Sequence, residues 1–212
     1  RVIIGDTFQN LANLLPHEDV FVITDGNVYP LLGQLKSKYP THTITPGESS
    51  KSLGVAQNIY EWLLEKGAHR RSFILGFGGG VVCDIAGFVA STYMRGIHFG
   101  FVATSLLAQV DASVGGKNGL NLDGYKNIIG TFKQPEFVIC DVLMLKTLPN
   151  EELANGFAEI VKHTLIADAK MFGFIEENVE GLLNRNGQII EKLVEHSVRV
   201  KARIVQADEF EK

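Results

Sequence analysis

The chain has 212 residues, 45% of them hydrophobic, and a formal charge of −4 from 20 basic and 24 acidic side chains. This composition is typical of a soluble globular protein with a substantial core, and it argues against disordered, collagen-like and coiled-coil chains. The basic residues are dispersed and the net charge is slightly acidic, so we expect no nucleic-acid partner.

Neither a membrane segment nor a secretory signal is expected from the sequence. It contains no uninterrupted run of eighteen apolar residues and does not open on a signal-peptide pattern. Its two cysteines, Cys83 and Cys140, each lie in an apolar stretch, which favours reduced core thiols over a disulfide framework. We therefore expect a cytoplasmic protein with no membrane partner.

Short apolar runs alternate with helical patterns through the first two thirds of the chain. Because apolar strands separated by helices suit a sheet that is covered on both faces, we predict an α/β class: a Rossmann-like, doubly wound parallel sheet over residues 1–148. The runs rich in Val, Ile and Phe predict strands at 2–4, 20–24, 42–45, 72–77, 98–102 and 137–140.

The pattern changes at Pro149, after which only helical periodicity is found. Helices are predicted over 151–167, 169–179 and 188–207, with Pro149 in the first turn of the first one. We interpret residues 149–212 as the first part of an all-helical domain. Since Arg1 opens the chain without a Met and no helix stop signal closes it, we expect a fragment of a longer protein.

A predicted strand leads into three consecutive glycines, Gly78, Gly79 and Gly80, and then into a helix. Glycines at such a turn let the main chain approach a pyrophosphate, and the helix N-terminus supplies oriented N–H groups. The spacing departs from the dinucleotide fingerprint, because Cys83 stands at the third glycine position. A tight turn with nothing bound and a phosphate-binding turn both fit this segment.

Two shorter polar segments follow other predicted strands. Asp25 and Asn27 could accept hydrogen bonds from ribose hydroxyls, although an ordinary Asp-Gly turn explains them equally well. Gly47, Glu48 and Lys51 are interpreted first as a turn and helix cap, with surface charges on the Glu and the Lys.

Glycines and ionisable groups alternate between Thr104 and Gly130, where periodicity is weak. A long glycine-rich loop of this kind is more often an active-site loop than a structural connection. Arg95, just before it, adds a planar cation suited to phosphate or carboxylate. The polar candidates within the loop are Asp111, Lys117, Lys126 and Asn127.

The predicted helices carry two further features. Glu159, Lys162 and His163 share one helix face, where either a surface ion pair or a site with Glu159 on a metal and Lys162 on an oxyanion would fit. Lys201 lies on an apolar face with Ile190, Val194, Ile204 and Val205; such a lysine either reaches water or binds an anion.

Taken together and in order, these motifs resemble the 3-dehydroquinate synthase family, a group of sugar-phosphate cyclases related in fold to iron-type and glycerol dehydrogenases. The resemblance covers nearly the whole chain with its spacing intact. It rests on Gly78-Gly79-Gly80-Val81-Val82-x-Asp84-x-x-Gly87, Arg95-Gly96, residues 106–117, Lys126-Asn127 and Gly156-x-Ala-Glu159-x-x-Lys162.

The resemblance implies an NAD- and zinc- (or cobalt-) dependent carbon–oxygen lyase. Such an enzyme converts 3-deoxy-D-arabino-heptulosonate 7-phosphate to 3-dehydroquinate and phosphate in the shikimate pathway, which leads to chorismate and the aromatic amino acids. The steps implied are transient oxidation by NAD, phosphate elimination, reduction and aldol closure. Another sugar-phosphate cyclase and a metal-dependent polyol dehydrogenase of the same fold are the alternatives.

The resemblance also implies the role of each candidate residue and a homodimer, in which Arg95 reaches the neighbouring subunit's phosphate site. Glu159 is the first metal ligand, and two histidines beyond Lys212 are the others, so we expect residues 1–212 alone to be inactive and to bind zinc poorly. Substrate groups correspond to Asp111, Lys117, Asn127, Lys162 and Lys201. The NAD contacts correspond to Asp25, Asn27, Gly47, Glu48, Lys51, Gly79, Gly80, Val81, Asp84, Thr104, Ser105, Lys117, Lys126 and Thr147.

Overall fold

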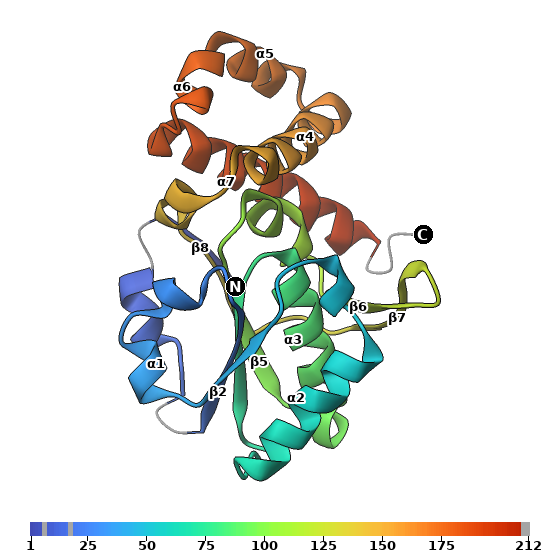
Figure 1. Ribbon diagram of the computed structural model, residues 1–212. Helices are drawn as coiled ribbons and strands as arrows, with labels where there is room; N and C mark the ends of the chain where they lie inside the picture. Colours follow the sequence, from blue (N-terminus) through green and yellow to red (C-terminus); the bar gives the residue numbers. More distant parts are fainter. Residues whose placement is uncertain (6–7, 17–18, 209–212) are drawn as a thin grey trace.

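The computed structural model describes residues 1–5, 8–16 and 19–208. An α/β layer forms one part of the molecule, and the last helices form a layer above it (Figure 1). Six parallel strands pair in the order β1-β8-β5-β4-β2-β3, which confirms the predicted fold class. Their bounds are β1 (Val2–Ile4), β2 (Val20–Asp25), β3 (Thr41–Ile44), β4 (Phe73–Gly78), β5 (His98–Ala103) and β8 (Val138–Cys140), so each predicted strand is present within a residue or so.

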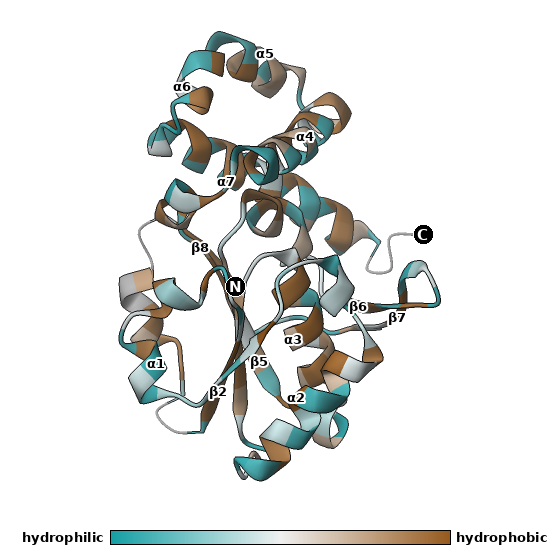
Figure 2. Ribbon diagram, in the orientation of Figure 1, coloured by the Kyte–Doolittle hydropathy of each residue, from teal (hydrophilic) through white to brown (hydrophobic). Residues whose placement is uncertain are grey.

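Both faces of the sheet are covered, because alternate side chains of each strand point to opposite sides. On one face, α2 (Leu53–Glu65) and α3 (Gly80–Thr92) pack on residues such as Ile23 and Ile74. On the other face, η1 (Phe8–Asn13), η2 (Tyr29–Leu32) and α1 (Leu35–Lys38) lie over residues such as Val22 and Leu75. The strands are accordingly among the most hydrophobic parts of the molecule in Figure 2.

The strand order reverses direction between β2 and β4. From β2 the chain moves outward to β3, then returns to the other side of β2 and continues through β4, β5 and β8. The Thr24 hydroxyl donates to the Phe77 carbonyl at 2.8 Å, which holds the ends of the two strands together. In open α/β sheets, ligands bind at such a reversal, outside the carboxyl ends of the strands.

The prediction of a long loop over residues 104–130 is wrong. The segment forms a one-turn π-helix, η5 (Ala108–Ala112), followed by a β-hairpin of β6 (Lys117–Leu122) and β7 (Tyr125–Phe132) that projects from the body in Figure 1. The strands escape prediction because β7 is largely exposed and β6 is rich in Asn and Gly. The polar residues of this segment therefore lie on regular secondary structure and not on an irregular loop.

The helical layer consists of α4 (Asn150–Ala167), α5 (Ala169–Glu177), α6 (Val179–Leu183) and α7 (Gly187–Ala207). Pro149 is the N-cap of α4 rather than part of its first turn, and the helix predicted over 169–179 ends at Glu177. Ile204, expected on the apolar face of α7, is 43% exposed. Three short helices complete the described elements: η3 (Glu48–Ser50), η4 (Tyr93–Arg95) and η6 (Val142–Thr147).

One glycine sets the distance between the two layers. A Cβ on Gly156 of α4 would lie 2.5 Å from the Leu106 Cβ and 2.8 Å from the Leu107 main-chain nitrogen. Only a residue without a side chain allows this approach. The close contact brings the middle of α4 against the segment that leads into η5.

Both cysteines are buried free thiols, as expected. Burial raises the pKa of the Cys140 thiol to about 12 and also raises that of Cys83. Within the described part of the chain, every helix is too short or too polar to cross a membrane.

Candidate active site

The glycine turn joins β4 to α3 at the point where the strand order reverses. Gly79 is the N-cap of α3 and has no side chain with which to cap the first N–H groups of the helix. A Cβ on Gly79 would lie 3.3 Å from the Ser105 Oγ, and one on Gly80 would lie 3.2 Å from the Ala112 Cβ. Because glycines line this helix N-terminus and leave its first N–H groups without a side-chain cap, it fits a pyrophosphate group.

A buried lysine lies beside this turn. Lys51 is only 4% exposed, and its Nζ donates to the Asp84 carboxylate at 2.5 Å and to the Asn127 side-chain carbonyl. The surface position expected for Lys51 is therefore wrong. Its burial could not be seen in the local sequence, because its partners lie 33 and 76 positions away. Burial raises the pKa of Asp84 to about 6, although the charge of Lys51 opposes this shift.

Glu48 remains at the surface, as expected. Its Oε1 accepts from Asn121 Nδ2 at 2.9 Å and lies 3.8 Å from Lys51 Nζ. Asp25 accepts from the main-chain nitrogens of Asn27 and Val28, at 2.8 and 3.2 Å, so the segment forms a local Asx turn. Asn27 is exposed beside it.

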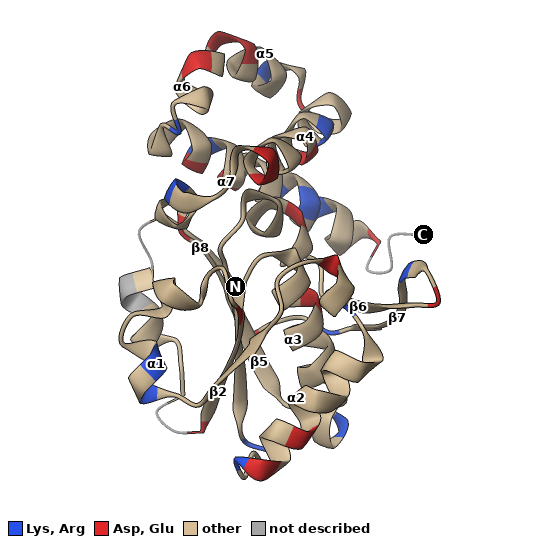
Figure 3. Cartoon of the chain, in the orientation of Figure 1, with Lys and Arg blue, Asp and Glu red and all other residues tan. Residues whose placement is uncertain are grey.

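Asp111 and Lys201 form the central ion pair of the site. Lys201 Nζ, on α7, donates to the Asp111 carbonyl at 3.0 Å and to its carboxylate. The Lys201 side chain is 13% exposed and that of Asp111 is 35% exposed, so the lysine lies against a polar partner and not in open water. Figure 3 shows basic and acidic residues together where α7 meets the α/β layer.

Glu159 lies on the face of α4 that points to this pair. Its carboxylate contacts Lys162, and its Oε1 lies 3.1 Å from His163 Nε2. Glu159 and His163 are only 15% and 5% exposed, whereas Lys162 is 56% exposed. The arrangement is thus a partly buried cluster and not the surface ion pair that was one interpretation. Burial lowers the pKa of His163.

Among the described residues, Asp111, Glu159 and His163 offer three ligand atoms that all lie within 4.8 Å of one another. Glu159 Oε1 is buried, with Lys162 Nζ and His163 Nε2 as its neighbours. Two carboxylates and an imidazole suit a first-row divalent metal ion. The residues present therefore fit the metal that the resemblance implies.

The other predicted residues fall into two groups. Thr104 and Ser105 follow β5 beside the glycine turn, where the Thr104 nitrogen donates to the Gly78 carbonyl at 2.9 Å. Val81 is half-buried in α3. The second group is exposed: Gly47 is the N-cap of η3, Lys117 and Lys126 lie on the hairpin, and Thr147 lies at the end of η6.

Arg95 lies away from the Asp111–Lys201 pair. It follows α3, which runs for 13 residues from the glycine turn to the opposite end of the strands. At 1.5 Å per residue, α3 is about 20 Å long. It is exposed and has a positive φ of 72°, between Met94 at 50° and Gly96 at 110°. Within this chain it therefore faces solvent, not the cluster around Asp111.

Sequence reasoning missed Gln109, which is fully buried in η5. Its amide nitrogen donates to the carbonyls of Ala103 and Asp141, at 3.0 and 2.9 Å, and so ties the ends of β5 and β8 to the turn that carries Asp111. The one signal in the sequence was its place within the motif at 106–117. Asn121 was missed as well; its side chain joins the hairpin to Glu48 and, within the hairpin, accepts from the Asn127 nitrogen.

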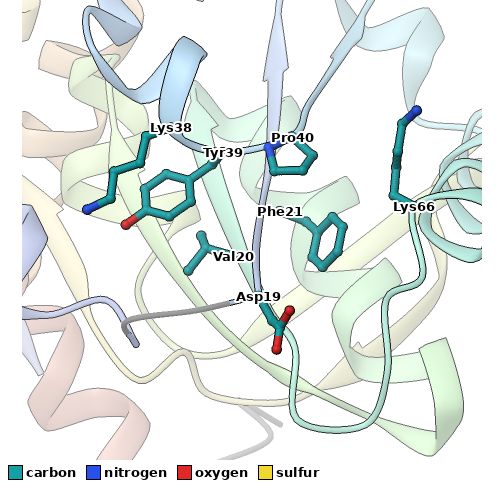
Figure 4. A pocket seen from close by; sticks show the side chains of 7 residues that line it. All are labelled: Asp19, Val20, Phe21, Lys38, Tyr39, Pro40 and Lys66. Atoms are coloured by element: carbon teal, nitrogen blue, oxygen red, sulfur yellow. The ribbon is translucent and has the colours of Figure 1, made fainter.

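A shallow cavity of about 460 Å³ lies at the opposite end of the strands from the glycine turn, where β2 and β3 begin. Figure 4 shows the side chains that line it, among them Lys38, Tyr39 and Lys66. None of the candidate site residues is among its lining residues. Its position away from the carboxyl ends of the strands separates it from the chemistry described above.

Comparisons with known proteins agree with this geometry. The family descriptions "3-dehydroquinate synthase N-terminal" and "3-dehydroquinate synthase C-terminal" match residues 41–155 and 156–212. The chain is 44% identical over 200 residues to the 3-dehydroquinate synthase of Alkaliphilus metalliredigens, covering 92% of this chain and 56% of that protein. It is 42% identical over 218 residues to that of Thermoanaerobacter sp., covering 97% and 61%.

Among solved structures, the 2-epi-5-epi-valiolone synthase of Streptomyces hygroscopicus, with NAD+ and Zn2+ bound, superposes with a TM-score of 0.90 at 27% identity. That match covers 100% of this chain and 62% of the other. The chain spans about three fifths of the length of the curated relatives named above. Both family descriptions and both relatives point the same way, and the chain belongs to the 3-dehydroquinate synthase family.

Proposed function

We propose that the protein is a 3-dehydroquinate synthase, which uses NAD and a divalent metal to convert 3-deoxy-D-arabino-heptulosonate 7-phosphate to 3-dehydroquinate and phosphate. One observation carries the proposal: Asp111, Glu159 and Lys201, from three separate elements, meet beside the glycine turn. Gly80 of that turn approaches Ala112, the residue after Asp111. A cofactor at the turn and a substrate at the cluster would then share one site.

Bound NAD supplies reversible hydride transfer. The N–H groups at the start of α3 would bind its pyrophosphate, since Gly79 and Gly80 allow close approach. Asp25 and Asn27, at the end of β2, would hold ribose hydroxyls. Buried Lys51, with Asp84 and Asn127, connects the turn to the hairpin. The remaining contacts are proposed at Gly47, Glu48, Val81, Thr104, Ser105, Lys117, Lys126 and Thr147.

A bound divalent metal would supply Lewis-acid chemistry at a substrate hydroxyl. Glu159 is the ligand that we assign to it here, and two histidines beyond Lys212 are the further ligands that family membership suggests. Lys117, Lys162 and Lys201 would hold the phosphate and carboxylate of the substrate, because ammonium groups neutralise anions at close range. Asp111 and Asn127 would hold its hydroxyls.

We propose a cytoplasmic homodimer in which Arg95 acts on the phosphate site of the second subunit. Its outward position at the far end of α3 supports this role, because it cannot serve the cluster around Asp111 in its own chain. A planar guanidinium suits bidentate contact with phosphate.

The test is an assay of the complete gene product with NAD+, Zn2+ and the heptulosonate phosphate. We expect stoichiometric release of inorganic phosphate and no net NADH. The Glu159→Gln and Lys201→Met variants should lose release, whereas Gly173→Ala, on α5 and outside the cluster, serves as a control. Net NADH accumulation would identify a polyol dehydrogenase instead. Phosphate release from a different sugar phosphate alone would identify another cyclase.

A further inference from the structure

We propose that Asn121, on β6, is a positioning residue for the reaction. It fixes the main chain at Asn127, to which the proposed function gives the substrate hydroxyls, and the carboxylate of Glu48, to which it gives a contact with NAD. The inference rests on that proposed function and adds to it a residue that contacts neither ligand. Asn121 acts through the two residues that do.

The first argument is the irregular pairing of the hairpin at Asn121. Its neighbours on β6 pair with Ile129 and Tyr125 of β7, so that the one residue Asn121 lies opposite three, residues 126–128. A bulge of this kind interrupts the ladder hydrogen bonds and turns side chains to new directions, often beside an active site. Asn127 lies within the bulge and has a positive φ of 53°. This segment therefore needs hydrogen bonds from outside the regular ladder.

The second argument is that the Asn121 side chain supplies such a bond. Its Oδ1 accepts from the Asn127 main-chain nitrogen at 2.8 Å, and its Nδ2 donates to Glu48 Oε1 at 2.9 Å. A side-chain amide offers both an acceptor and donors. The opposite orientation of the amide would set its NH₂ group against an N–H and its oxygen against a carboxylate, so the two partners fix the orientation. Asn121 thus holds Asn127 and Glu48 at set places relative to each other.

The third argument is the connection to the buried lysine. The Asn121 main-chain nitrogen donates to the Lys51 carbonyl at 2.8 Å, and Lys51 Nζ donates to the Asn127 side-chain carbonyl. Asn127 is therefore held at its main chain by Asn121 and at its side chain by Lys51. A polar group that is already fixed in this way loses less conformational entropy when a substrate binds.

The experiment uses the complete gene product, and its first variant is Asn121→Asp. This change keeps the acceptor for the Asn127 nitrogen but sets a second carboxylate against Glu48. NAD+ should bind about three- to tenfold more weakly, because the two negative charges repel each other and displace Glu48. At saturating NAD+, kcat for phosphate release should stay within about twofold of wild type, because Asn127 is still held.

The second variant, Asn121→Ala, removes both side-chain bonds. NAD+ affinity should again fall, and kcat should now fall as well, by about tenfold or more, because Asn127 has lost its main-chain support. Hydrogen exchange read by mass spectrometry checks the same contact without turnover. Peptides that contain Asn127 should exchange as in wild type in Asn121→Asp, and at least about tenfold faster in Asn121→Ala.

Asn118→Ala is the matched control. Asn118 lies on the same strand, and its amide donates to the carbonyls of Gly116 and Lys133, neither of which is a proposed ligand contact. The substitution should lower the urea midpoint but leave NAD+ affinity and kcat within about twofold of wild type. It therefore separates the stability of the hairpin from the placement of Asn127 and Glu48.

Three results would each overturn the proposal: unchanged kcat in Asn121→Ala, equal losses of kcat and NAD+ affinity in Asn121→Asp, or the losses of Asn121→Ala repeated in a folded Asn118→Ala. If the wild-type protein releases phosphate while one of these results holds, the proposed function stands and this inference alone fails. If the wild-type protein releases no phosphate, the proposed function fails, and hydrogen exchange still decides whether Asn121 holds Asn127.

Discussion

Lys201 and Asp111 are 90 positions apart, and the lysine donates to both the carbonyl and the carboxylate of the aspartate. This contact joins α7 to η5, and hence the helical layer to the end of β5. It also places a cation in the cluster that contains Glu159. Two predictions concern Lys201.

The first concerns stability. Lys201→Met removes the ammonium and leaves the Asp111 carboxylate without this partner, so the free energy of unfolding should fall by about 1 kcal/mol. Asp111→Asn should cost a similar amount, and the double variant should cost less than the sum because both changes remove one interaction. Urea unfolding of the four proteins measures the coupling; strict additivity would show that the pair contributes nothing.

The second concerns function in the complete gene product. Lys201→Ala should lower kcat/KM for phosphate release by about 100-fold, since the loss of a buried charged contact to a substrate anion costs roughly 3 kcal/mol. NAD+ affinity should change less than about twofold, because the glycine turn is untouched. Equal losses of turnover and NAD+ affinity, measured by kinetics and by fluorescence titration, would contradict the role given to Lys201.

A third prediction concerns the packing of the hairpin on α3. A Cβ on Gly87 would lie 1.8 Å from the Asn118 Oδ1 and 2.5 Å from its Cγ. Asn118 cannot easily move, because it is 4% exposed and its amide donates to the carbonyls of Gly116 and Lys133. Gly87→Ala should therefore lower the free energy of unfolding by about 1–3 kcal/mol.

Gly173→Ala provides the control for that change. Gly173 lies inside α5, and a Cβ there meets nothing within 4 Å. The substitution should raise the free energy of unfolding by up to about 1 kcal/mol, through helix propensity alone. Opposite signs in urea unfolding are expected for the two variants. A Gly87→Ala protein as stable as wild type would show that the hairpin shifts without cost.

The strands could be predicted from sequence because the sheet is covered on both faces, which makes each strand a nearly continuous apolar run. β6 could not, because its inward residues include Asn118, whose amide is satisfied by carbonyls that only the folded hairpin supplies. Nothing in a local pattern distinguishes such a buried amide from a loop residue. The same holds for Gln109 in η5.

The site shows a similar division. The glycine turn was visible because it follows a strand directly. The sequence predicts a surface position for Lys51, since its immediate neighbours form a turn; its burial depends on Asp84 and Asn127, which are distant in sequence. His163 was noted on the same helix face as Glu159, but the presence of Asp111 beside both is a property of the packing of α4 on η5.

A final prediction concerns pH. Burial raises the pKa of the Asp84 carboxyl from its ordinary 3.8 to about 6, so between these values the folded protein binds more protons at this group than the unfolded chain. The free energy of unfolding should therefore fall as pH rises from about 4 to above 6, and stay level beyond. Part of the side chain is exposed, so we expect a loss on the order of 2 kcal/mol.

Asp84→Asn isolates this contribution, because the amide keeps an acceptor for Lys51 but cannot ionise. The wild-type protein and the variant should have similar stability near pH 4, and the variant should become progressively the more stable of the two up to about pH 7. Other titrating groups cancel in the difference, so urea unfolding of both proteins at several pH values gives the Asp84 contribution directly. A constant difference would mean that Lys51 offsets the cost of burying the charge, so that the pKa of Asp84 is the same in the folded and the unfolded protein.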